Sequence, residues 1–138
     1  MKNKKMKKLT VVLAAALLLL VLPAGAQQKV DRKNLTIKEW NTDVRTNQKY
    51  LDHVTTYNAQ GKKIEEIEYT PLGQKWRKRY EHGENGKVSK EYIYDERNVM
   101  ISYKVFEYNE IGKKTQTTYT PKGKVKTIKV YEYIVTEE

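Results

Sequence analysis

The chain has 138 residues, with 27 lysines and arginines against 17 aspartates and glutamates, and it contains no cysteine. A chain without cysteine forms no disulfide and carries no lipid-modified cysteine, so packing and hydrogen bonds must stabilise its fold. The net charge of +10 overstates the basic character of the folded part, because the chain after residue 26 carries 22 basic against 17 acidic side chains. A balance of +5 permits anionic partners without indicating one.

The N-terminus has the three parts of an export signal peptide. Five lysines stand within residues 2–8, an apolar run of 14 residues follows from Leu9 to Leu22, and Ala24 and Ala26 form a small-x-small cleavage motif. A membrane anchor is the alternative, but spanning a bilayer takes roughly 20 apolar residues. We therefore predict cleavage after Ala26 and a periplasmic or secreted protein, which is not membrane-embedded after cleavage and does not bind nucleic acid.

The signal peptide leaves a chain of the size of one domain. Residues 1–26 are the cleaved signal peptide, residues 27–33 form a flexible N-terminal tail, and residues 34–138 form a single β-repeat domain. The 112 residues that remain after cleavage suffice for one domain and are too few for two.

From Tyr57 onward one short pattern recurs: an aromatic residue, a turn-forming quartet that closes in Gly or Asn, and a strand-like segment. The quartet fits a type I turn followed by a residue with positive φ, since Asn, Asp or Thr commonly opens it and Pro stands second in two copies. The closing positions lie 11 to 14 residues apart, which is typical of repeated hairpins. They are Gly61, Gly73, Gly86, Asn98, Gly112 and Gly123.

The segments between these turns have the length of strands and are rich in Tyr, Val, Ile and Thr. We predict an all-β fold, an antiparallel meander of about eight strands in an open twisted sheet, with a small closed barrel as the alternative. Residues 74–81 and 113–118 cannot alternate apolar side chains outward, which excludes a lipid-facing barrel. The strands are expected at residues 35–41, 49–57, 62–69, 74–81, 87–94, 99–108, 113–119 and 124–134.

The tyrosine-led repeat resembles the YD repeat of RHS and teneurin-type secreted proteins. Its acidic form stands at residues 94–99, Tyr-Asp-Glu-Arg-Asn-Val, and Tyr-Asn-x-x-Gly-Lys copies stand at residues 57–62 and 108–113. The chain departs from the family pattern, because Asp occurs in one copy, Arg never follows Gly, and Asn98 replaces a glycine. The resemblance implies an exported β-repeat protein, like small exported bacterial proteins that carry such repeats.

Side chains capable of catalysis are few. Ser89 and Ser102 are expected in mid-strand without the glycines of a nucleophile elbow, and neither His53 nor His82 has a second ligand or acid at a useful spacing. We therefore predict that the protein is not an enzyme and has no catalytic, metal-binding or cofactor-binding residues and no cofactor.

Aromatic residues are plentiful instead, with 11 tyrosines and 2 tryptophans. A tyrosine before a hairpin turn commonly packs on the neighbouring strand, and exposed Tyr and Trp also stack on sugars or anchor protein partners. Trp76 is the strongest single candidate, because basic residues flank it. The candidate partner-binding residues are Trp76, Arg77, Lys78, Tyr80, Tyr92 and Tyr94.

These features favour an exported, non-catalytic binding module for an unknown protein or glycan of the cell envelope or the exterior. The alternative is a structural envelope protein that self-assembles into a homo-oligomer through its β-edges. A small enzyme is the third interpretation.

Overall fold

A computed structural model describes residues 29–137, which form eight strands and no helix. The predicted all-β fold is confirmed, and every strand begins within one residue of its predicted position. The signal peptide predicted for residues 1–26 lies outside the described residues, and within them no helix is long and apolar enough to cross a membrane. The strands are β1 (Thr36–Asp43), β2 (Gln48–Tyr57), β3 (Lys63–Thr70), β4 (Gly73–His82), β5 (Val88–Tyr94), β6 (Met100–Tyr108), β7 (Lys113–Tyr119) and β8 (Val125–Val130).

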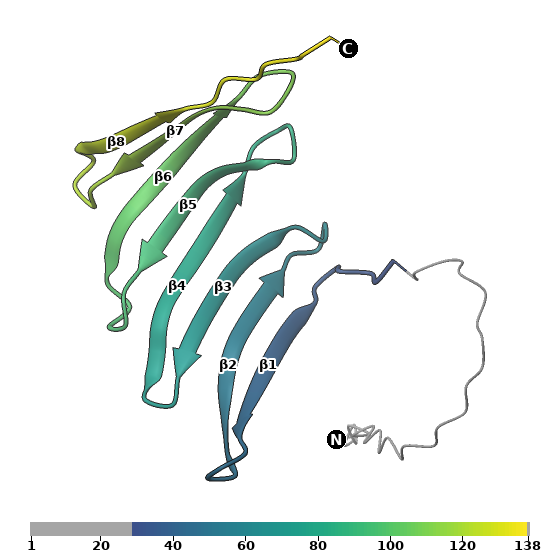
Figure 1. Cartoon of the computed structure of the whole chain (residues 1–138), viewed down its shortest axis with the longest axis vertical. Helices are drawn as coiled ribbons and strands as arrows, with labels where there is room; N and C mark the ends of the chain where they lie inside the picture. Colours follow the sequence, from purple (N-terminus) through teal and green to yellow (C-terminus); the bar gives the residue numbers. More distant parts are fainter. Residues whose placement is uncertain (1–28, 138) are drawn as a thin grey trace, which may run out of the picture.

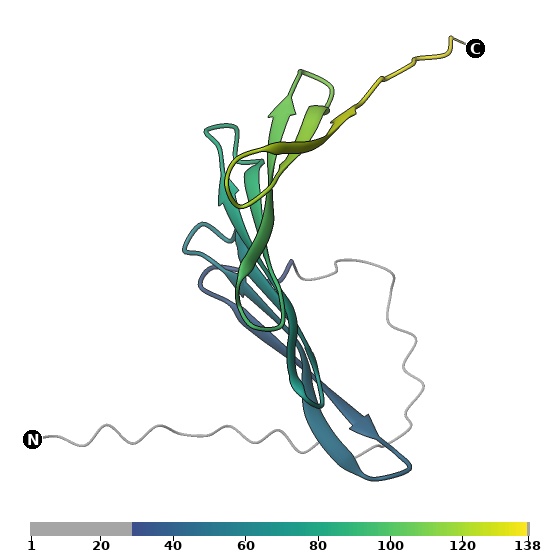
Figure 2. The same cartoon turned by 90° about the vertical axis from the view of Figure 1, so that its left-hand side faces the viewer.

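The eight strands pair in chain order in one antiparallel sheet (Figure 1). Strands β1 and β8 are its two edges and do not pair with each other, so the sheet is open and the closed-barrel alternative is wrong. An eight-stranded barrel must fill its interior with side chains, whereas β3 and β4 supply mainly charged ones. Figure 2 shows the result, a twisted single layer with no second layer of described residues on either face.

The last strand is shorter than predicted, because it ends at Val130 and not at residue 134. Val130 pairs with Thr115, and the Tyr131 backbone N–H still donates to the Lys114 carbonyl oxygen at 3.1 Å. Strand β7 begins at Lys113, which is opposite Glu132 in this register, so the chain beyond Glu132 has no position of β7 to pair with.

Four hairpin turns share one geometry, the predicted type I turn closed by a left-handed residue. In the first, the Gly61 N–H donates to the Asn58 carbonyl oxygen at 2.9 Å, and the Asn58 N–H donates to the Lys62 carbonyl oxygen at 2.9 Å. The closing residues have φ between 62° and 86°, a region that Gly and Asn adopt most readily. They are Gly61, Gly86, Asn98 and Gly123.

Two turns depart from this geometry. Gly73 pairs directly with Thr70 across a two-residue turn and has a φ of 126°. At Gly112 the expected positive φ is wrong, and the Asn109 N–H instead donates to the Gly112 carbonyl oxygen at 2.8 Å. A Cβ atom at Gly112 would stand 2.6 Å from the hydroxyl oxygen of Tyr133, which donates to the Lys113 carbonyl oxygen at 2.8 Å, so a larger residue there would displace this hydroxyl.

The conformational role of Gly61 predicts that its replacement by Val costs about 1 kcal/mol or more of unfolding free energy, because a β-branched residue resists positive φ. A Cβ atom there meets nothing closer than 3.7 Å, so crowding does not contribute. Asn tolerates the left-handed region, and Gly61→Asn should melt near the parent. Thermal melts of both variants measure this, and equal melting temperatures would contradict the turn assignment.

At Gly112 we expect crowding by the new side chain, and not the backbone conformation, to lower the stability. Gly112→Ala should lower the melting temperature because its new methyl group meets Tyr133, and Gly112→Asn should do no better. In a Tyr133→Ala background Gly112→Ala should be close to neutral. A double-mutant cycle measures this coupling. Additive effects of the two substitutions would contradict a steric role for Gly112.

The tyrosine that precedes most turns marks an irregularity in strand pairing. In five of the seven strand pairs the register shifts immediately before this tyrosine. Such bulges increase the local twist of a sheet. The tyrosines concerned are Tyr57, Tyr69, Tyr94, Tyr108 and Tyr119. The repeat visible in the sequence is therefore a unit of bulge plus turn.

The cross-strand register divides the side chains between two faces, because directly paired residues point the same way. We call one the Phe106 face; Thr55, Glu66, Lys78 and Ser102 also lie on it. We call the other the Tyr103 face. Among the described residues only Phe106, Thr55 and Ser102 are buried, all on the Phe106 face, so Phe106 is the one buried hydrophobic side chain.

Candidate functional site

The structure does not bring the six predicted partner-binding residues together. Trp76, Lys78 and Tyr80 alternate with Arg77 along β4, so these three lie on the Phe106 face and Arg77 lies on the Tyr103 face. The remaining two, Tyr92 and Tyr94, pair with Arg79 and Arg77 and share the Tyr103 face. Two separate surfaces must therefore be considered.

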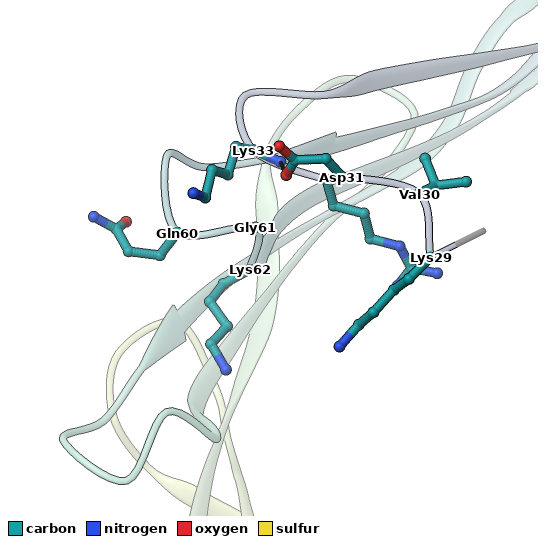
Figure 3. Close-up of a pocket in the computed structure, with 8 residues that line it drawn as sticks. Lys29, Val30, Asp31, Lys33, Gln60, Gly61 and Lys62 are labelled. Carbon is teal, nitrogen blue, oxygen red and sulfur yellow. Dashed lines mark hydrogen bonds between the residues drawn. The ribbon is translucent and has the colours of Figure 1, made fainter.

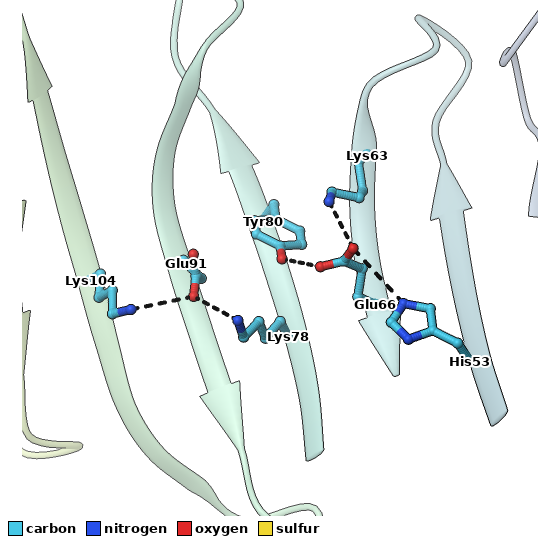
Figure 4. Close-up of polar contacts among 7 residues, drawn as sticks. All are labelled: His53, Lys63, Glu66, Lys78, Tyr80, Glu91 and Lys104. Carbon is cyan, nitrogen blue, oxygen red and sulfur yellow. Dashed lines mark hydrogen bonds and ion pairs between the residues drawn. The ribbon is translucent and has the colours of Figure 1, made fainter. Parts of the chain in front are cut away.

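A polar cluster around Glu66 links strands β2, β3 and β4 on the Phe106 face (Figure 4). The Glu66 carboxylate accepts hydrogen bonds from Lys63 Nζ at 2.8 Å and from the Tyr80 hydroxyl at 2.5 Å. His53 Nε2 lies 3.9 Å from the same carboxylate. The cluster ties three neighbouring strands together across a face that has little apolar packing.

The two hydrogen-bonded partners change each other's acidity. Burial raises the pKa of the Glu66 carboxyl, but the hydrogen bonds from Lys63 and Tyr80 and the charges of Lys63 and His53 outweigh it, and the net pKa is lowered. For the Tyr80 hydroxyl, burial and the bond to Glu66 both raise the pKa far above the ordinary range. Glu66 is therefore a stable acceptor at neutral pH and Tyr80 a stable donor.

A second ion-pair cluster lies beside the first. Glu91 Oε1 is 3.7 Å from Lys78 Nζ and 3.7 Å from Lys104 Nζ, so one carboxylate bridges cations of β4 and β6 (Figure 4). The charges on the Phe106 face are thus largely paired within the layer.

Trp76 is engaged by its own neighbours on this face. Its ring meets the His53 ring edge-on with centroids 5.9 Å apart, and Lys78 Nζ lies 5.0 Å from the ring centre. These contacts indicate that Trp76 packs on the sheet and favour a structural role over partner binding.

The Tyr103 face carries a row of aromatic side chains. Arg79, Tyr92, Tyr103 and Tyr119 are successive direct partners across β4 to β7. The rings of Tyr103 and Tyr119 stack with centroids 4.9 Å apart and planes 12° apart, and the Tyr92 ring lies 6.0 Å from Tyr103 on its other side. Tyr103 therefore has an aromatic neighbour on each side, stacked on the Tyr119 side and tilted by 34° on the Tyr92 side.

Exposed aliphatic side chains surround this tyrosine row. Val105, Thr117 and Ile128 form the next row of direct partners, two residues along each strand. Ile128 is 63% exposed, and Ile101, which shares the face with Tyr103, is 49% exposed. Exposed apolar side chains that gather on one face mark an interaction surface more often than scattered ones do.

The end of the row at β4 is charged and slightly hollow. Arg79, Glu81, Tyr92 and Tyr94 line a hollow of about 170 Å³ to which Tyr80 also contributes. Glu81 accepts a hydrogen bond from the Tyr92 hydroxyl at 3.0 Å. The Arg79 side chain is 58% exposed, and its nearest carboxylate, Glu65, lies at 3.9 Å.

A basic cleft lies apart from both faces, where the N-terminal arm meets the β2–β3 turn (Figure 3). Its volume is about 1070 Å³, and Asp31 is the only carboxylate among its lining residues. The arm is held by a hydrogen bond of 2.9 Å from the Asn34 N–H to the Asn58 carbonyl oxygen, and the Arg32 guanidinium lies 5.3 Å from the Tyr57 ring centre. The cationic side chains that line it, which can attract an anion, are Lys29, Arg32, Lys33 and Lys62.

The sequence alone does not indicate this cleft. Its two basic segments, residues 29–33 and 60–62, are visible in the sequence, but only the pairing of the arm with the turn brings them together. The predicted places of the serines are confirmed, since both lie in strands. The Ser89 hydroxyl donates to the Glu81 carbonyl oxygen at 3.2 Å, and Ser102 is buried. Within residues 29–137 no three His, Asp or Glu side chains gather as a metal site would require.

Comparison with known proteins does not identify a family for this chain. No protein-family model matches the chain. No curated protein matches it at a significant level. The resemblance to YD repeats therefore stays a prediction from the residues.

Proposed function

We propose that the chain is an exported, non-catalytic binding module that contacts a protein or glycan of the cell envelope or the exterior through its Tyr103 face. The observation that carries this proposal is the ridge of Tyr92, Tyr103 and Tyr119 beside exposed Ile101 and Ile128 on an uncovered single-layer sheet. Apolar surface of this kind is stabilised when a partner removes it from water. The exposed aliphatic side chains of Ile101 and Ile128 beside the row favour a protein over a glycan.

Two adjacent residues of β8 allow a matched test of the face. Ile128 lies on the Tyr103 face and Thr127 on the Phe106 face, and both are exposed. Binding of the mature domain to an array of bacterial envelope proteins and glycans should be lost in Ile128→Asp and kept in Thr127→Asp. Equal effects of the two substitutions would contradict the assignment of the face.

Export itself is tested by mass spectrometry of material recovered outside the cytoplasm. The expected mass is that of a chain beginning at Gln27. An intact Met1 on the exported protein would contradict the proposed signal peptide and the periplasmic or secreted location.

A structural protein that assembles through its sheet edges is the second candidate. Every residue of β1 and β8 is exposed, and an unpaired strand can pair with the edge of another copy. Lys126 and Lys129 oppose such pairing on β8, which is why this function ranks second. Proline substitutions along β8 should abolish assembly if edges carry it, as measured by sedimentation.

A further inference from the structure

We propose that the partner of the Tyr103 face is a second copy of this chain, packed face to face into a two-layer sandwich. This inference rests on the proposed function, because both require the Tyr103 face to bind a partner. A sheet with one apolar face is stabilised by packing that face on another layer, and the described residues supply none.

The Phe106 face is a poorer choice, because Phe106 is already buried and Glu66 and Glu91 pair with cations there over β3 to β6. The ion pairs of the Tyr103 face join Glu65 to Arg77 and Arg79 at β3 and β4, away from the tyrosines of β6 and β7.

The lengths of the side chains on the Tyr103 face determine how two copies can pack. Packed sheets lie about 10 Å apart, so a long tyrosine must face a short side chain and not another tyrosine. The row of Lys90, Val105, Thr117 and Ile128 runs beside the tyrosine row, and its short side chains at Val105 and Thr117 form a groove along Tyr103 and Tyr119. A two-fold axis that crosses the strands midway between the two rows places the ridge of each copy over the groove of the other.

The same axis pairs opposite charges at the β4 end of both rows. Arg79 stands in the tyrosine row, while Glu81 pairs with Lys90, which pairs with Val105, and so stands in the groove row. The axis therefore places Arg79 opposite the partner's Glu81, twice in each dimer. Arg79 can make this contact, because its side chain is 58% exposed and its ion pair with Glu65, at 3.9 Å, is long.

Exchanging the two charges tests this geometry. Sedimentation equilibrium of the mature chain should show a dimer that Arg79→Glu and Glu81→Arg each weaken by about tenfold or more, because each places like charges opposite one another. The double substitution restores opposite charges and should return the dissociation constant to near that of the parent. Ile128→Asp should also weaken the dimer, and Thr127→Asp should not.

Rescue between chains separates the proposed contact from a loss of stability within one chain. Arg79 and Glu81 lie two residues apart on one face of β4 and line the same hollow, so the double substitution also keeps any contact between them within one chain. An equimolar mixture of Arg79→Glu and Glu81→Arg restores opposite charges only between chains, and it should dimerise like the parent.

A dimer that both single charge exchanges leave unchanged, or a double variant no better than the single ones, would overturn the proposed packing. A concentration-independent monomer would overturn it too, yet the proposed function would survive if Ile128→Asp still abolished binding to an envelope component. A monomer in which Ile128→Asp does not abolish binding to an envelope component would overturn both the dimer and the proposed function.

Discussion

Replacing Phe106 by alanine should be the most damaging single substitution in the sheet, with a loss of about 3 kcal/mol of unfolding free energy. Phe106 is 8% exposed and is the one buried hydrophobic side chain among the described residues. Lys113 Nζ lies 4.7 Å from its ring centre, so the substitution also removes a cation–π contact. Urea denaturation followed by circular dichroism measures the loss.

An exposed residue of similar character serves as the control. Ile111 is 65% exposed in the β6–β7 turn, and Ile111→Ala should change the unfolding free energy by less than about 0.5 kcal/mol. Phe106→Leu keeps most of the buried volume and should fall between the two, which covers the case in which the alanine variant does not fold. A Phe106→Ala midpoint equal to that of Ile111→Ala would show that the sheet has no apolar centre at Phe106.

The strands and most turns could be predicted because their determinants are local. Asn58 and Asp95 each accept hydrogen bonds from two backbone N–H groups of their own turn, and a window of five residues contains all the groups involved. At Asp95 the bonds from the Val99 and Arg97 N–H groups also lower the pKa of the carboxyl. A repeat that places such residues at regular spacing fixes the positions of the hairpins.

What could not be predicted depends on contacts distant in the sequence. Gly112 lies against the hydroxyl of Tyr133, 21 residues later, although its position in the repeat indicated a positive φ. The basic cleft depends on the arm at Arg32 meeting the turn at Gly61. Alternation along β4 does predict that Arg77 faces away from Trp76, but the basic flank drew these residues into one candidate set.

The hydrogen bond from Tyr80 to Glu66 should account for the second large loss of stability. Tyr80→Phe removes the donor at 2.5 Å and leaves the ring, so the expected cost is about 1.5 to 3 kcal/mol, the range for a hydrogen bond to a charged group. Glu66→Gln keeps the size of the acceptor and removes its charge, and with it the ion pair to Lys63 at 2.8 Å. Both variants should therefore melt below the parent at pH 7.

The dependence of this loss on pH follows from the lowered pKa of Glu66. The folded pKa lies below the ordinary value of 4.5, so the charged carboxylate stabilises the fold fully above that value, and the stabilisation is lost as the pH falls through the folded pKa. Urea midpoints of the parent and Glu66→Gln should thus differ at pH 7, and the difference should shrink as the pH falls below 4.5 and through the lowered pKa of Glu66. Asp95 titrates in both proteins and cancels from the comparison. A difference that stays constant from pH 7 to pH 3 would mean that the charge on Glu66 does not stabilise the junction of β2, β3 and β4.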